Sequence, residues 1–264
     1  MSTPDTVEIS SRDNPLLKEL RKLAHEPGAY RKLGRVWLEG DHLCRAARER
    51  GVRPAIAVFA DHFWPQAQFE WAGVAAKTVI VPAALLQGVS GLESPAPMGF
   101  VMDLPGAPSL QAGVPTVVLD RLQDAGNVGS ILRSAGAFGF RQIVALKGTA
   151  ALWSPKVLRA GMGAHFGLQL VEGVDAGALD ALALPLVATS SHAGQWLHEA
   201  QAGRTLPEPC AWLMGHEGQG VSPELEARAT HRIRIAQPGG EESLNVAAAA
   251  AICLHASATL RVST

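Results

Sequence analysis

Short apolar runs alternate with helical patterns through the second half of the chain. The runs are apolar at successive positions rather than at every second one, which is typical of strands covered on both faces of a sheet. The predicted strands are Thr116–Leu119, Gln142–Leu146, Gly167–Val171, Leu186–Ala188, Ala211–Met214 and Arg232–Ile235. Strands that alternate with helices favour an α/β fold, so we predict a mostly parallel sheet with helices on both faces.

The N-terminal part of the chain has its own pattern. Asn14 and Pro15 open a predicted helix that has leucines on one face and cations on the other. Further predicted elements are a strand at Val36–Gly40, a helix at Leu43–Arg50 and a strand at Ala55–Ala60. The pattern up to Phe100 therefore predicts a small, separate α/β unit.

A segment rich in Pro, Gly and small residues separates these two patterns. It reads DLPGAPSLQAGVP over residues 103–115 and shows no helical or strand period, which is typical of a linker. We therefore predict a domain at residues 1–105, a linker at 106–113 and a second domain at 114–264.

Composition narrows the class of protein. Of the 264 residues, 47% are hydrophobic and 18% charged, which indicates a globular chain. No apolar run approaches the roughly 20 residues that span a bilayer, and no secretory signal pattern begins the chain, so we expect a soluble cytoplasmic protein without a membrane partner. The cysteines are expected to be reduced core residues, and the histidines lack the paired spacing of a metal site.

Basic residues gather at the N-terminal end although the net charge is −1. Residues 1–53 hold eleven Lys and Arg against eight Asp and Glu, a net of +3. One interpretation is a solvated helix face, and the other is a surface that contacts RNA phosphates. The candidate RNA-binding residues are Lys18, Arg21, Lys22, Arg31, Lys32 and Arg35.

Ligands in a parallel sheet gather at the carboxyl ends of the strands, so the loops that leave the strands are the first place to look for a site. The loop after Leu119 leads to Asn127, which is expected to cap a helix. Arg133 follows six residues later and need not share a helix face with Asn127.

Two later loops carry unusual patterns. Gly215, Gly218 and Gly220 would let the backbone approach a ligand closely, with Glu217 at the edge of the loop. The third loop follows the strand that ends at Ile235, and a helix predicted over Ser243–His255 begins after two acids.

These three loops resemble, in order, the motifs of SpoU-type RNA ribose 2′-O-methyltransferases, a branch of the SPOUT superfamily. The matching residues are Asn127-Val128-Gly129 with Arg133, then Gly215-His216-Glu217-Gly218-Gln219-Gly220, then Pro238 with Glu242-Ser243-Leu244-Asn245-Val246. The resemblance covers about Val114 to the end. The first hundred residues more weakly resemble the family's ribosomal-protein-like substrate domain, through Asn14-Pro15, Lys18 and Leu38-Glu39-Gly40.

The resemblance implies a C-terminal trefoil knot from about Thr189 onward and a homodimer formed through the knotted domain. It also implies that S-adenosylmethionine binds in the knot. The cofactor-binding positions carried over from the family are Thr189, Gly215, Ile235 and Leu244.

The catalytic positions carried over are Asn127, Arg133, Glu217, Ser243 and Asn245. The side chains expected to orient the ribose and Arg133 are those of Asn127, Glu217, Ser243 and Asn245. In the family the arginine is usually described as the base, but guanidinium groups stay protonated in proteins. We therefore hypothesise that Arg133 holds a phosphate and stabilises the developing alkoxide.

Several functions remain open on the sequence alone. Methylation of ribosomal RNA is favoured, with methylation of transfer RNA and a catalytically silent RNA-binding relative as alternatives. A nicotinamide-dependent oxidoreductase is also compatible with an α/β pattern, although no Gly-rich turn of the dinucleotide-binding type follows the strand that ends at Leu119.

Overall fold

The computed structural model describes residues 5–239 and 243–262. The chain divides into two compact units. The first comprises Met1–Gly106 and Trp153–Phe166, and the second comprises Ala107–Leu152 and Gly167–Thr264. The short segment 153–166 thus packs with the first unit although it lies far along the chain.

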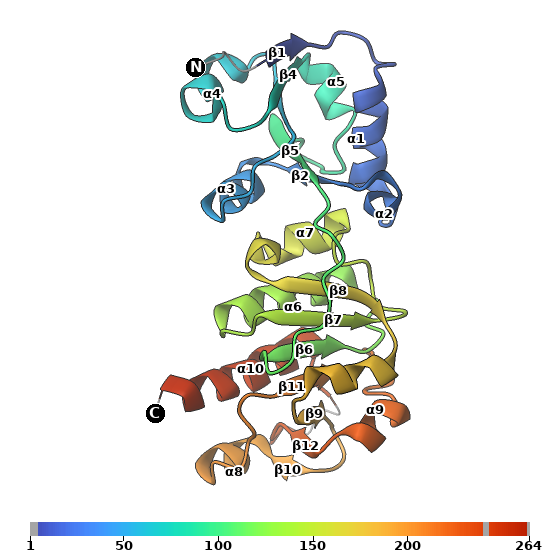
Figure 1. Cartoon of the computed structure of the whole chain (residues 1–264), viewed down its shortest axis with the longest axis vertical. Helices are drawn as coiled ribbons and strands as arrows, with labels where there is room; N and C mark the ends of the chain where they lie inside the picture. Colours follow the sequence, from blue (N-terminus) through green and yellow to red (C-terminus); the bar gives the residue numbers. More distant parts are fainter. Residues whose placement is uncertain (1–4, 240–242, 263–264) are drawn as a thin grey trace. The chain divides into compact units, whose positions relative to one another are not determined.

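The first unit is built on a five-stranded mixed sheet. Its strands are β1 (Asp5–Glu8), β2 (Arg35–Glu39), β3 (Ile56–Ala60), β4 (Lys77–Val81) and β5 (Met98–Asp103), in the order β1-β4-β3-β5-β2. β1, β4 and β3 are parallel, whereas β5 runs antiparallel to both β3 and β2. Its helices are α1 (Pro15–His25), α2 (Ala29–Leu33), α3 (Asp41–Glu49), α4 (Trp64–Trp71), α5 (Ala83–Gln87) and α7 (Pro155–Gly161). The small α/β unit predicted from the sequence is therefore present (Figure 1).

Helix α1 begins and packs as its sequence predicts. The side-chain oxygen of Asn14 accepts a hydrogen bond of 2.9 Å from the backbone N–H of Leu16, and Pro15 occupies the first helical position. Leucines on one face are buried while Lys18 and Lys22 on the other are exposed. Burial of the apolar face holds this helix against the unit.

The second unit contains a seven-stranded sheet in which every pair of neighbours is parallel. Its strands are β6 (Thr116–Leu119), β7 (Gln142–Leu146), β8 (Gln169–Val174), β9 (Leu186–Thr189), β10 (Gln195–Trp196), β11 (Ala211–Met214) and β12 (His231–Arg234), in the order β10-β12-β9-β11-β6-β7-β8. Each of the six predicted strands is present, with shifts of one to three residues at some ends. The two-residue strand β10 is additional, because so short a run has no detectable period.

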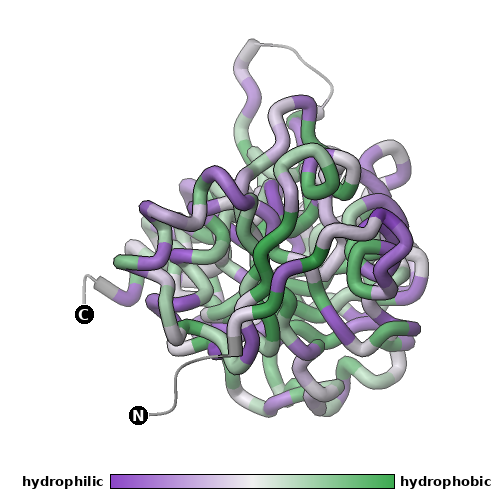
Figure 2. The backbone as a smooth tube through the Cα atoms, turned by 90° about the horizontal axis from the view of Figure 1, so that it is seen from above, coloured by the Kyte–Doolittle hydropathy of each residue, from purple (hydrophilic) through white to green (hydrophobic). Residues whose placement is uncertain are grey.

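Helices cover both faces of this sheet, as predicted. They are α6 (Ala125–Ala137), α8 (Leu197–Ala202), α9 (Pro223–Arg228), α10 (Val246–Val262) and the 3₁₀ segment η2 (Ala176–Leu182). A second 3₁₀ segment, η1 (Ala164–Gly167), contains the point in the chain where the first unit gives way to the second. On one face Leu213 packs with Leu182 and Leu225, from η2 and α9. On the other, the indole N–H of Trp212 donates to the hydroxyl of Ser257 in α10 at 3.0 Å. Figure 2 colours the backbone by hydropathy and shows hydrophobic stretches alternating with hydrophilic ones along the chain.

Helix α10 begins later and ends later than the predicted range of Ser243–His255. Asn245 precedes it, and its side-chain oxygen accepts hydrogen bonds from the backbone N–H groups of Ala247 and Ala248, at 2.9 and 3.3 Å. Asn245 therefore caps the helix, and Ser243 lies outside it. The helix packs along α6, where its alanines allow close approach.

The cysteines behave as the sequence predicts. Cys44, Cys210 and Cys253 are free and buried, and burial raises the pKa of the Cys210 thiol to about 12. Within residues 5–239 and 243–262, no cluster of His, Cys, Asp or Glu has the arrangement of a metal site. None of the described helices is long and apolar enough to cross a membrane.

Candidate active site

The site begins where β6 leads into α6. The carboxylate of Asp124 accepts a hydrogen bond of 2.8 Å from the backbone N–H of Asn127, so Asp124 caps the helix. The prediction that Asn127 is the cap is therefore wrong. Asn127 is the third residue of α6, and this position leaves its side-chain amide available for contacts outside the helix.

A chain of side-chain hydrogen bonds joins the three predicted loops. The amide N–H of Asn245 donates to the side-chain oxygen of Asn127 at 3.0 Å. The amide N–H of Asn127 in turn donates to the carboxylate of Glu217 at 3.3 Å. The chain therefore brings residues 118 positions apart into contact. Asn127, Glu217 and Asn245, which the sequence predicts as one group, do lie together.

Glu217 connects its own loop to the start of α6. Its carboxylate also accepts from the backbone N–H groups of Gln123 and Asp124, at 3.3 and 3.1 Å. Partial burial tends to raise the pKa of Glu217, but hydrogen bonds from backbone N–H groups and from Asn127 outweigh it, so this pKa is lowered. The carboxylate is thus held in its charged form.

The lowered pKa predicts how this contact responds to acid. A carboxylate with a lowered pKa in the folded state contributes stability above its ordinary pKa of about 4.3, and this contribution is lost as the pH falls through the folded-state value. We expect the difference in melting temperature between wild type and Glu217→Gln to be constant near neutral pH and to shrink in acid below that range. Thermal unfolding of both proteins at a series of pH values measures this difference in melting temperature. A difference that grows on acidification would contradict the lowered pKa of Glu217.

The loop from Gly215 to Val221 folds tightly on itself. The backbone N–H of His216 donates to the carbonyl of Gly220 at 3.0 Å, and the N–H of Gly220 donates back to His216 at 2.8 Å. A Cβ atom at Gly215 would lie 2.0 Å from the carbonyl carbon of Gly220. This position therefore requires glycine because of a contact within the loop, whereas the close approach of this backbone to a ligand stays a prediction.

A second set of contacts fixes this loop at its far end. Asp120, whose side chain is 3% exposed, accepts from the backbone N–H of Ser222 at 2.7 Å and from Arg121 at 2.9 Å. Arg121 also donates to the side-chain oxygen of Gln219 at 3.1 Å. Its φ of 58° lies in the left-handed region, which is unusual for a residue with a side chain. The buried Asp120 thus holds the glycine loop beside β6.

Removal of this carboxylate should destabilise the protein. Asp120→Ala leaves the N–H of Ser222 and the guanidinium of Arg121 without their acceptor, which costs about 1–3 kcal/mol. Asp175→Ala is the control, because Asp175 pairs with Lys147 while both side chains are mostly exposed, and should cost about 0–1 kcal/mol. Chemical denaturation measures both, and equal effects would show that Asp120 has no special role.

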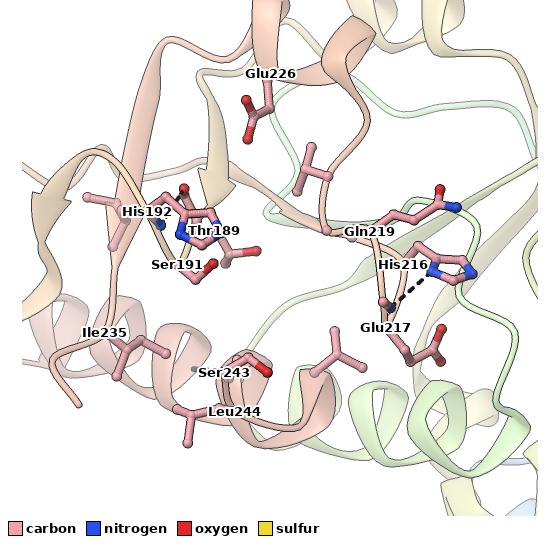
Figure 3. Close-up of a pocket in the computed structure, with 18 of the residues that line it drawn as sticks. Thr189, Ser191, His192, His216, Glu217, Gln219, Glu226, Ile235, Ser243 and Leu244 are labelled. Atoms are coloured by element: carbon pink, nitrogen blue, oxygen red, sulfur yellow. Dashed lines mark hydrogen bonds between the residues drawn. The ribbon is translucent and has the colours of Figure 1, made fainter. Parts of the chain in front are cut away.

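A cavity of about 370 Å³ lies between the segments that follow β9, β11 and β12. Among the residues that line it are all four predicted cofactor-binding positions, Thr189, Gly215, Ile235 and Leu244, together with Glu217 and Ser243. Figure 3 shows Thr189 and His192 on one side, His216 and Glu217 on another, and Ser243 with Leu244 below them. The volume of the cavity lies within the range of small-molecule sites.

Several residues of this cavity were not predicted from the sequence. The additional polar ones are Ser190, Ser191, His192, Gln219, Glu226 and Gln237. The sequence could have indicated the residues after β9, because polar residues follow this buried strand directly. It could not have indicated Glu226, since an acid on a short helix is usually solvated. Among the described lining residues there are two carboxylates, Glu217 and Glu226, and no Lys or Arg, which suits a ligand with positive charge.

Arg133 stands apart from this cavity. It is exposed on α6 and does not belong to the described lining. In the part of the chain that the structure describes, its guanidinium makes no hydrogen bond or ion pair. It lies six residues beyond Asn127, roughly 9 Å along the helix axis and on a different face. The structure does not join Arg133 to the group formed by the other predicted catalytic residues, and its role stays a prediction.

The six predicted RNA-binding cations belong to the first unit and differ in their surroundings. Arg21 donates to the backbone carbonyls of Arg12 and Gly88, at 3.4 Å. Arg35 forms an ion pair of 3.3 Å with Glu19. These two guanidinium groups are half-buried and have structural contacts. The exposed members of the set are Lys18, Lys22, Arg31 and Lys32.

Comparison with known proteins identifies the class. Residues 115–255 match the model of the SpoU rRNA methylase family, which is more than half of the chain and includes all three loops. An uncharacterized tRNA/rRNA methyltransferase of Synechocystis is 31% identical over 96% of this chain and 94% of its own length. The chain therefore belongs to the SpoU rRNA methylase family.

Individual relatives agree with this placement. The 23S rRNA (guanosine(2553)-2′-O)-methyltransferase RlmP of Bacillus subtilis is 28% identical over 94% of this chain and 98% of that protein. Among solved structures, an AdoMet-bound rRNA methyltransferase from Sinorhizobium meliloti aligns with a TM-score of 0.81 at 25% identity, covering 97% of this chain and 98% of that one. An RNA 2′-O ribose methyltransferase aligns with a TM-score of 0.78 at 28% identity, covering 97% and 99%.

Proposed function

We propose that this protein transfers a methyl group from S-adenosylmethionine to a ribose 2′-hydroxyl in structured RNA, with ribosomal RNA favoured over transfer RNA. The observation that carries the proposal is the hydrogen-bonded chain from Asn245 through Asn127 to Glu217, at the edge of a cavity of cofactor size. The rRNA 2′-O-methyltransferase among the relatives supports the choice of RNA.

The cavity fits the proposed cofactor. S-adenosylmethionine carries a positively charged sulfonium and ammonium, and the described lining offers carboxylates without a competing cation. A dinucleotide cofactor carries negatively charged phosphates, which would find no Lys or Arg among the described lining residues. The same lining therefore disfavours the oxidoreductase alternative. Thr189, Gly215, Ile235 and Leu244 would hold the cofactor. When bound, it supplies a methyl group activated by the sulfonium.

The remaining residues orient the substrate. A 2′-hydroxyl must approach the methyl carbon in line with the sulfur, so positioning contributes most of the rate. Asn127 and Asn245 hold each other and Glu217 in fixed orientations, which prepares amide and carboxylate groups to position a ribose. Arg133 offers a fork of donors to the RNA phosphate and to the 2′-oxygen, whose proton passes to a neighbouring group or to water. Its exposed guanidinium, without a partner among the described residues, is available for that contact.

The finer features of the fold belong to the same proposal. The C-terminal segment from about Thr189 forms the trefoil knot of the SPOUT superfamily, residues 1–105 form a ribosomal-protein-like RNA-binding domain, and residues 106–113 link it to the methyltransferase domain at 114–264. The parallel sheet with covered faces supports this assignment. A protein of this function would act in the cytoplasm.

A homodimer through the knotted domain completes the proposal. On α10, Ala248, Ile252 and His255 are exposed at spacings of four and three residues, so they share one helix face. Ile252 is 41% exposed, and α6 with Arg133 packs beside this helix. We propose that this face packs against a second copy.

A charge on this face should break the dimer. Ile252→Glu introduces a carboxylate that is costly to bury, so we expect the mass in solution to fall from dimer to monomer. Phe69→Glu is the control, since Phe69 is 89% exposed on α4 of the first unit, and it should leave the mass unchanged. Light scattering during size-exclusion chromatography measures both. A wild-type monomer, or a dimer that survives Ile252→Glu, would contradict this interface.

Methyl mapping tests the proposed reaction. RNA from cells with and without the gene is compared for 2′-O-methylated positions, and the purified protein is then given the unmethylated RNA with S-adenosylmethionine. We expect a 2′-O-methyl site in ribosomal RNA that is lost with the gene and restored by the protein. Methylation of a base, or of no RNA, would overturn the proposal.

A further inference from the structure

One polar group in the cavity has no partner. The side-chain oxygen of Gln237 is buried, and within residues 5–239 and 243–262 it accepts no hydrogen bond. Gln237 also lines the cavity. A buried acceptor without a donor is costly, so a ligand that brings an N–H group to this oxygen would remove that cost.

The two sides of the cavity suit different parts of the cofactor. Glu217 contacts Asn127, so the methyl group and the target ribose belong on the Glu217 side. In Figure 3 Ile235 lies on the other side of the cavity from His216 and Glu217, with Leu244 below and between the two sides. The side chains of Ile235 and Leu244 offer apolar surface that suits the flat face of a purine base.

Gln237 is close to Ile235 along the chain. It follows Ile235 by two residues, and both residues line the cavity. A purine that packs against Ile235 therefore presents its edge within reach of the Gln237 side chain. In the adenine ring system of the cofactor, the 6-amino group is the only N–H donor.

We infer that the side-chain oxygen of Gln237 accepts a hydrogen bond from the 6-amino group of the adenine in S-adenosylmethionine, and so determines the base that the cavity accepts. This assignment rests on the proposed function for the identity of the cofactor. Gln237 is absent from the residues predicted from the sequence, because its missing partner is visible only in the folded chain.

Binding of the reaction product and of one analogue of it tests the contact without RNA and without turnover. One ligand is S-adenosylhomocysteine, and the other is the same molecule with purine in place of adenine, which lacks only the 6-amino group. Isothermal titration calorimetry gives both dissociation constants. Because loss of one donor leaves the Gln237 oxygen unpaired, we expect wild type to bind the purine ligand roughly tenfold more weakly.

Variants assign this discrimination to one side chain. Gln237→Met keeps the length but removes the acceptor, so it should weaken the adenine ligand about tenfold and the purine ligand by about twofold or less. Gln237→Glu keeps an acceptor and should keep the preference for adenine. Gln219→Met is the matched control: Gln219 also lines the cavity, but its side-chain oxygen already accepts from Arg121, so both ligands should change by the same factor.

The outcomes separate this inference from the proposed function. If Gln237→Met weakens both ligands equally, or neither, the contact with the 6-amino group is wrong while cofactor binding stands. If wild type binds neither ligand, both the contact and the cofactor assignment fall. If Gln237→Met loses the preference for the adenine ligand as expected but no RNA is methylated, the contact stands and the proposed reaction is wrong.

Discussion

Arg133→Ala should lower the rate of methyl transfer about a hundredfold to a thousandfold while leaving cofactor binding unchanged. Removal of a donor that stabilises a developing oxyanion has costs of this size. Arg133 does not line the described cavity, so the dissociation constant of S-adenosylhomocysteine should stay within about twofold. Single-turnover transfer to RNA and calorimetric binding measure the two quantities separately.

Arg133→Lys refines this prediction. Lysine keeps the positive charge but lacks the planar fork, so we expect it to recover only part of the activity. A Lys variant with wild-type activity across pH would show that the fork is not needed. A large loss of cofactor affinity in Arg133→Ala would instead place the residue in the cofactor site.

Gly215→Ala should weaken cofactor binding about a hundredfold while leaving the chain folded. The added methyl group would lie 2.0 Å from the carbonyl carbon of Gly220 and from the backbone nitrogen of Val221. Backbone atoms cannot move aside as a flexible side chain can, so the loop must open and displace the wall of the cavity. We expect the dissociation constant for S-adenosylhomocysteine to rise about a hundredfold, which corresponds to about 2.7 kcal/mol.

Gly218→Ala in the same loop is the matched control. A Cβ atom there meets only the His216 ring, at 3.9 and 4.0 Å, which is ordinary contact. Cofactor affinity should stay near that of wild type, and circular dichroism should show that both variants are folded. Equal affinities for the two variants would mean that the tight turn at Gly215 does not shape the cofactor site.

The sequence predicted the sheet and the meeting of the three loops for physical reasons. Runs such as Gln142–Leu146, which is apolar at four successive positions, predict covered parallel strands, and loops that leave such strands gather at one edge of the sheet. The contacts of Asn127, Glu217 and Asn245 follow from that arrangement. Their chemical roles stay predictions, as does the role of Arg133.

Other features depend on contacts that have no local signature. Asp124 and Asn127 are both good helix caps three residues apart, so the pattern alone does not choose between them. Gly163 packs so closely on Ala46 that an added Cβ atom would lie 2.4 Å from the alanine methyl, and this contact in the first unit comes from residues distant in sequence. The unpaired oxygen of Gln237 is likewise a property of the folded chain.

A structure of the protein with S-adenosylhomocysteine and its RNA substrate is the most direct test of the account. We predict that the sulfur lies between the Gly215 and Leu244 loops, with the target 2′-oxygen facing it and the guanidinium of Arg133, from either copy of the dimer, on the adjacent phosphate. A ligand bound elsewhere, or an Arg133 that in both copies stays remote from Glu217 and Asn245, would contradict the account.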